Sequence, residues 1–123
     1  MNFKVWKIST ESFLDEVISE YNCICNSHLE KDLLFFEEIS IEGKKFYNDS
    51  DILKFKYLEE LNKEIDLIGS FHFNRDDLSY EIDIYNNERY ICLNYVGNGI
   101  FRDFEKIGTI QENPELTRGE TFE

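Results

Sequence analysis

The chain has 123 residues and carries 26 acidic side chains against 13 basic ones, a formal net charge of −13. Such an excess repels nucleic acid and anionic membranes, so it argues against binding to either and favours a basic protein partner through electrostatic steering. Solubility alone is the competing explanation of the charge. A hydrophobic content of 41% and a single proline exclude a disordered chain, and the length fits one domain, residues 1–123.

The sequence predicts a cytoplasmic protein. No apolar run approaches the roughly 20 residues of a transmembrane helix, and the first residues lack the apolar core of a signal peptide. The three cysteines, Cys23, Cys25 and Cys92, are an odd number and too few for a disulfide framework, so we expect reduced thiols.

The first part of the chain predicts a strand, a helix and a hairpin. Residues 3–8 are rich in β-forming side chains. Residues 11–21 predict an amphipathic helix, because their apolar side chains share one helical face and their acidic side chains lie outside it. Those apolar residues are Phe13, Leu14, Val17, Ile18 and Tyr21. Residues 32–42 favour a strand that pairs back with residues 44–47, with a helix over 32–38 as the alternative.

Residues 51–65 predict a second amphipathic helix. The apolar residues at helical spacing are Leu53, Tyr57, Leu58, Leu61 and Ile65. Glu59 precedes Lys63 by four residues, which is the favourable order for an ion pair on a helix.

Residues 66–97 predict the centre of the fold, a meander of three antiparallel strands over 67–74, 79–85 and 89–96. Alternation is clean in the middle strand. Tyr80, Ile82 and Ile84 fall on one side, and Glu81, Asp83 and Tyr85 on the other. This pattern is typical of a sheet with one dry face and one wet face.

The rest of the chain predicts a short helix from Ile100 to Gly108, because Phe101, Phe104 and Ile107 have helix-like spacing. Residues 111–123 predict a loosely ordered tail. The expected fold class is therefore α+β: an antiparallel sheet of four to six strands with two amphipathic helices packed on one face.

The candidate metal and catalytic residues are few. Cys23 and Cys25 are separated by one residue, whereas paired zinc ligands are usually separated by two to four, and His28 adds no second ligand pair. His72 is predicted on the wet face of its strand. There it would act either as a general base or as a surface residue paired with a carboxylate. No Ser, Cys or Thr stands in a sharp glycine-flanked turn as a nucleophile. We therefore expect no metal, no cofactor and no enzymatic activity.

The acidic wet face of the meander is the candidate binding site for a partner. Its residues are Asp76, Asp77, Glu81, Asp83, Tyr85 and Glu88. Their spacing does not match a twelve-residue calcium loop. Exposed tyrosines beside charge are typical of binding surfaces, so Tyr80, Tyr85, Tyr90 and Tyr95 add to the prediction, although several of them would also suit core packing.

The layout resembles bacterial immunity proteins of polymorphic toxin systems, including contact-dependent growth inhibition. The features that carry the resemblance are a small acidic chain, a predicted helix over residues 50–65, and antiparallel strands with a charged hairpin over residues 84–91. The polar segment at residues 117–121 is similar to one near the end of such a family. The resemblance implies a tight complex with a toxin nuclease domain and no activity of the chain's own.

The sequence thus predicts an inhibitor that binds a basic toxin by charge-complementary docking. Its carboxylates would pair with the lysines and arginines of the toxin that otherwise hold phosphates. The alternative is a small ligand-binding domain or enzyme with a pocket between helices and sheet.

Overall fold

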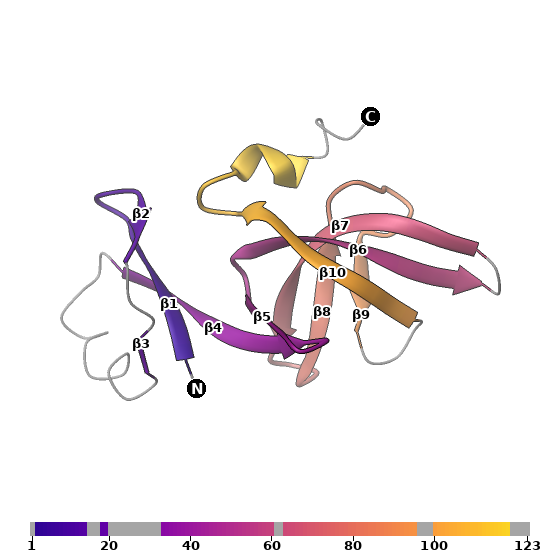
Figure 1. Cartoon of the computed structure of the whole chain (residues 1–123), viewed down its shortest axis with the longest axis horizontal. Helices are drawn as coiled ribbons and strands as arrows, with labels where there is room; N and C mark the ends of the chain where they lie inside the picture. The colour runs from indigo at the N-terminus through magenta and orange to yellow at the C-terminus, as the bar shows by residue number, and fades with distance from the viewer. Residues whose placement is uncertain (1, 15–17, 20–32, 61–62, 96–99, 119–123) are drawn as a thin grey trace.

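The computed structural model describes residues 2–14, 18–19, 33–60, 63–95 and 100–118, and all the sheet pairing within them is antiparallel (Figure 1). The first sheet has the order β2-β1-β4-β5, with β3 also paired to β1. Its strands are β1 (Asn2–Lys7), β2 (Ser12–Phe13), β3 (Ile18–Ser19), β4 (Leu33–Ile41) and β5 (Lys44–Tyr47).

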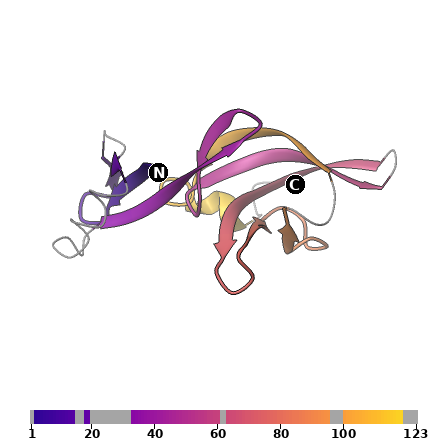
Figure 2. The same ribbon diagram turned by 90° about the horizontal axis from the view of Figure 1, so that it is seen from below.

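The second sheet has the order β10-β6-β7-β8-β9. Its strands are β6 (Asp51–Glu60), β7 (Lys63–Asn74), β8 (Ser79–Ile84), β9 (Cys92–Asn94) and β10 (Ile100–Thr109). A single 3₁₀ turn, η1 (Pro114–Arg118), follows β10. The turn between β7 and β8 projects from the body of this sheet (Figure 2).

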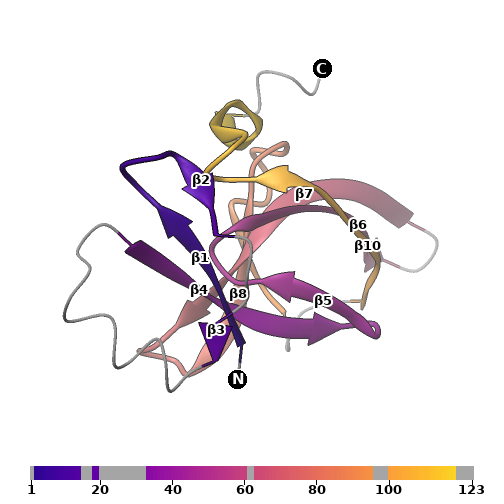
Figure 3. The same cartoon turned by 60° about the vertical axis from the view of Figure 1, so that its left-hand side comes forward.

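The core lies between the second sheet and the β4–β5 hairpin, which rests against β6 and β10 (Figure 3). Ile41 and Phe46 come from the hairpin. The second sheet supplies the other members: Leu53, Phe55, Tyr57, Leu67, Phe71, Ile82, Ile84 and Phe104. Phe104 is fully buried and stacks on Phe55, with 4.9 Å between the ring centroids.

The expected α+β class is wrong, because the described part of the chain contains no α-helix. Residues 51–65 form β6 and the start of β7 instead of the second helix. Leu53, Phe55 and Tyr57 are buried, whereas Lys54 between them is exposed, so the side chains follow the strand period of two. Pairing with β7 and β10 on its two sides satisfies the backbone of β6.

The ion pair predicted between Glu59 and Lys63 is present, with 3.2 Å between Glu59 Oε2 and Lys63 Nζ. It joins the ends of two paired strands rather than successive turns of a helix. Leu61, predicted on the apolar face of that helix, lies outside the described residues.

The short helix predicted over residues 100–108 is also wrong, since these residues belong to β10. Between Arg102 and Glu105 the register with β6 shifts by one residue, a β-bulge. The extra residue lets Phe101 and Phe104, three positions apart, both pack on the core side. The bulge thus produces the spacing that mimics a helix.

The helix predicted over residues 11–21 is contradicted where the structure describes it, because Ser12–Phe13 and Ile18–Ser19 are strands paired with β1. Residues 15–17 and 20–21 lie outside the described part. Phe13 packs its ring edge-on against Trp6, with 4.8 Å between centroids. This cross-strand contact favours the extended conformation.

The strands predicted from alternation and turn signals are confirmed. Residues 3–8 correspond to β1, residues 32–42 and 44–47 to the β4–β5 hairpin, and residues 67–74 and 79–85 to β7 and β8. The third strand of the meander is shorter than predicted and consists of β9 alone. Of the predicted tail, residues 111–118 are described and 119–123 are not.

Candidate functional site

The outer face of β7, β8 and β9 carries the acidic residues that the sequence singled out. Because Phe71, Ile82 and Ile84 point into the core, their strand neighbours point outward. Strand register places His72 opposite Glu81, and Asp83 between Ser70 and Cys92. We call His72, Glu81, Asp83 and Cys92 the acidic sheet face.

Gly69 allows β7 and β8 to approach closely beside Asp83. A Cβ atom at Gly69 would lie 2.3 Å from the backbone oxygen of Asp83, so any other residue would push the strands apart. The position therefore requires glycine, because the two backbones lie too close for a side chain.

His72 is bound by a carboxylate from outside the meander. Asp49 lies in the turn between β5 and β6 with a φ of 62°, and its Oδ1 is 2.8 Å from His72 Nδ1. The hydrogen bond to Asp49 raises the pKa of His72, and the negative charges of Asp49, Asp83 and Glu81 raise it further, while burial opposes them. The imidazolium form is thus favoured beside three carboxylates.

The surroundings of Asp83 disfavour its ionised form. Burial is the main cause of its raised pKa, and the nearby charges of Asp49 and Glu81 add to it, whereas His72 lowers it. Glu81 accepts hydrogen bonds from Asn74 Nδ2 at 3.0 Å and from the Cys92 thiol at 3.4 Å. The acidic sheet face therefore holds negative charge that the chain itself only partly compensates.

The Cys92 thiol is not a nucleophile in this setting. Burial raises its pKa to about 11, and the hydrogen bond to Glu81 and the charges of Glu81 and Asp83 act in the same direction. Reactive cysteines need the opposite, electropositive surroundings. No group of three or more His, Cys, Asp or Glu side chains suited to a metal ion occurs in the described ranges. Cys23, Cys25 and His28 lie outside them.

The turn after β7 is organised by Asn74. Its Oδ1 accepts hydrogen bonds from the backbone amides of Asp76 and Asp77, at 2.9 and 3.2 Å. Its Nδ2 donates to Asp77 as well as to Glu81. One asparagine thus links the turn carboxylates to the acidic sheet face.

The other predicted binding residues lie at the far end of β8. Tyr85 follows the strand and is half-buried, and burial is the main cause of its raised pKa. Glu88 is exposed in the next turn. The structure therefore brings Asp76, Asp77, Glu81 and Asp83 into one region and leaves Glu88 apart from it.

Most of the four tyrosines follow the alternative of core packing. Tyr80, Tyr90 and Tyr95 pack against the core, so their role in a binding surface is reduced. His72 is a wet-face residue paired with a carboxylate, but its hydrogen-bond partner is Asp49. Asp49 was not predicted at the site, because residues 48–50 resemble a cap of the helix predicted after them, whereas they form the β5–β6 turn.

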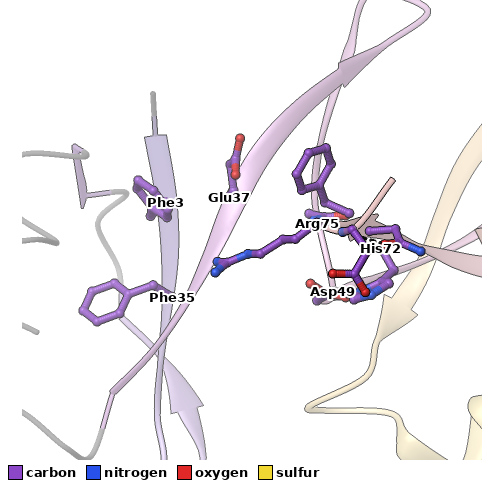
Figure 4. A pocket seen from close by; sticks show the side chains of 10 residues that line it. Phe3, Phe35, Glu37, Asp49, His72 and Arg75 are labelled. Atoms are coloured by element: carbon purple, nitrogen blue, oxygen red, sulfur yellow. Dashed lines mark hydrogen bonds and ion pairs between the residues drawn. The ribbon is translucent and has the colours of Figure 1, made fainter. Parts of the chain in front are cut away.

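A groove of about 610 Å³ adjoins the acidic sheet face (Figure 4). One wall is formed by Phe3 of β1 and by Phe35 and Glu37 of β4. Asp49 and His72 lie on the opposite side. The pocket between helices and sheet, which belonged to the alternative function, lacks its helices in the described part of the chain, and this groove lies between two sheets instead.

Five further residues complete the lining of the groove: Asn48, Phe73, Asn74, Arg75 and Asp76. Asn48 is only 6% exposed, and its Oδ1 accepts no hydrogen bond from the described residues. Arg75 and Asp76 come from the projecting turn after β7. The side chain of Arg75 extends across the groove toward β4 (Figure 4).

No family model matches the chain, and searches of curated proteins and of solved structures also find no match. Among the described residues no helix is long and apolar enough to cross a membrane.

Proposed function

We propose that the protein is an inhibitor that binds a basic protein through the acidic sheet face and the adjoining turn. The partner would be a toxin nuclease domain, as for the immunity proteins that the sequence resembles. The observation that carries the proposal is the cluster of Asp49, Glu81 and Asp83 around a single imidazole, since such a group of like charges is unfavourable until an opposite charge meets it.

Binding rather than catalysis is the activity that these side chains support. The His72 imidazole is held by Asp49, and the neighbouring thiol is kept protonated by burial and by Glu81. A cysteine nucleophile is activated by a lowered pKa, and the Cys92 pKa is raised. A carboxylate surface instead suits the lysines and arginines with which a nuclease holds phosphates.

The test compares two double variants with equal charge change. Glu81→Gln with Asp83→Asn removes two charges from the acidic sheet face. Glu105→Gln with Glu115→Gln removes two exposed charges on β10 and on η1. Each variant and the parent protein are used as bait in lysate of the source cell at low and moderate salt, and captured proteins are identified by mass spectrometry.

The expected partner is a basic protein that the parent and the Glu105/Glu115 variant retain and the Glu81/Asp83 variant loses. With that partner purified, surface plasmon resonance should show faster dissociation for the Glu81/Asp83 variant alone, because interfacial charge pairs act mainly on dissociation. The partner should cleave nucleic acid, and the parent protein should inhibit the cleavage. Equal loss of binding in both folded variants would reject the acidic sheet face as the site.

A further inference from the structure

The groove beside the acidic sheet face carries an excess of negative charge. Its carboxylates are Glu37, Asp49 and Asp76, and its cations are His72 and Arg75. Asp49 and His72 neutralise each other through their 2.8 Å contact. The two negative charges of Glu37 and Asp76 are therefore balanced only by the single positive charge of Arg75. Glu81 and Asp83 add negative charge next to the groove. A cation is the ligand that this balance favours.

The wall on β4 combines a carboxylate with aromatic rings. Phe3 is paired with Glu37 across the strands, and Phe35 lies two residues before Glu37 on the same face of β4. All three side chains are half-buried and remain accessible from the groove. A planar cation can stack on a phenylalanine ring while it donates hydrogen bonds to a carboxylate.

Two observations point to a guanidinium in particular. Arg75 already extends across the groove toward β4, so the space accommodates that group (Figure 4). Asn48 contributes a buried Oδ1 that lacks a described donor. Arginine carries five N–H donors on a flat, weakly hydrated group, whereas lysine carries a compact, strongly hydrated charge. Only arginine can stack and reach several acceptors at once.

We propose that the groove is a binding site for an arginine side chain of the basic partner, which displaces Arg75 and occupies the space between Phe35 and Glu37. This site deepens the proposed function and rests on it. Arg75 is exposed at the projecting turn, so its side chain can leave the groove without exposing core residues. In the free protein the Arg75 side chain occupies the site that the partner's arginine takes in the complex.

The test needs no purified partner. Acetyl-Gly-Arg-Gly-amide is titrated into the ¹⁵N-labelled protein, and the matched peptides contain citrulline, a neutral isostere, or lysine. The arginine peptide should cause saturable amide shifts at Phe35, Glu37 and His72. The lysine peptide should bind at least about threefold more weakly, and the citrulline peptide should cause no saturable shifts.

Variants define which side chains take part. Glu37→Gln should weaken arginine-peptide binding by about two- to fivefold, the equivalent of one lost charge pair. Arg75→Gln should tighten it by at least about threefold, because the competing guanidinium is gone. Glu105→Gln, on the opposite edge strand β10, is the control and should change nothing. Thermal melts check that each variant is folded.

The proposal is overturned if the citrulline peptide matches the arginine peptide, or if either groove variant leaves the affinity unchanged. Failure of the proposed function has a different signature. The Glu81/Asp83 variant would then retain the protein partner, whatever the peptide does. Conversely, loss of the partner by that variant, together with no arginine-peptide binding, would reject the groove site alone.

Discussion

The carboxylate of Glu42 accepts a hydrogen bond from the backbone amide of Phe104, with 3.0 Å between Oε1 and N. The same carboxylate accepts from Asp103 N, and Lys44 Nζ donates to Phe104 O at 2.9 Å. Both backbone groups of Phe104 are thus satisfied by side chains of the β4–β5 hairpin, at the bulge where β10 leaves its register with β6. The two sheets are joined at this point.

Glu42→Ala should lower the free energy of unfolding by about 1.5–3 kcal/mol, the usual range for hydrogen bonds to a charged group. Glu42→Gln keeps one acceptor oxygen and should lose less. Lys45→Ala removes an exposed partner of Glu38 and should cost under about 1 kcal/mol. Urea unfolding measures all three, and a Glu42→Ala midpoint equal to the parent's would mean that this junction contributes no stability.

Gly69→Ala should destabilise the protein by about 1–3 kcal/mol or more, because the new methyl group meets the backbone oxygen of Asp83. Backbone cannot rotate away as a flexible side chain can. Ser40→Ala, at an exposed position of β4, is the control and should be nearly neutral. A thermal midpoint of Gly69→Ala that equals that of the control would show that β7 and β8 lie further apart than described.

Asp83→Asn should stabilise the protein at neutral pH. The pKa of Asp83 is raised by burial and by neighbouring carboxylates, so its ionised form is disfavoured in the folded state. That cost is present above the folded-state pKa and disappears as the pH falls through it. The gain should be under about 1 kcal/mol, since the side chain is only half-buried.

The comparison variant for Asp83 is Asp76→Asn, which neutralises an exposed carboxylate in the turn. Its urea midpoint at pH 7 should equal that of the parent. A lower midpoint for Asp83→Asn than for Asp76→Asn would contradict the like-charge explanation. A gain would mean that the acidic sheet face retains a charge that folding alone does not favour, as expected of a binding surface.

His72 should make stability depend on pH. Its folded-state pKa is raised above the ordinary 6.5, chiefly by the hydrogen bond to Asp49. The stability from this pair is therefore fully present below about pH 6.5 and is lost as the pH rises through the folded-state pKa. Asp49→Asn should lower the His72 pKa and flatten this dependence, and asparagine also tolerates the positive φ of this position.

Two measurements check the His72 prediction. NMR titration of the ring protons gives the pKa in the parent and in Asp49→Asn, with His72→Gln to assign the signal. Urea midpoints on both sides of pH 6.5 give the stability. If the His72 pKa is the same in the parent and in Asp49→Asn, the contact with Asp49 does not control its protonation.

Local signals were sufficient for the hairpins. Glu42-Gly43 and residues 74–77 are turn sequences between short alternating runs, so β4 with β5 and β7 with β8 could be predicted from neighbours in the chain. The same alternation placed Glu81, Asp83 and His72 on the outer face. These features depend on contacts between residues close in sequence, which a pattern of side chains can encode.

The sequence by itself determined the strong negative charge, the hairpins and the face on which the acidic residues lie. Only the tertiary structure decided that residues 51–60 and 100–109 are strands, because their apolar spacing suits a helix unless partner strands and a bulge are known. It also decided that Asp49 binds His72, 23 residues away, and that the first sheet completes a groove beside the acidic sheet face. Such contacts depend on how distant strands pack, and no local pattern carries that information.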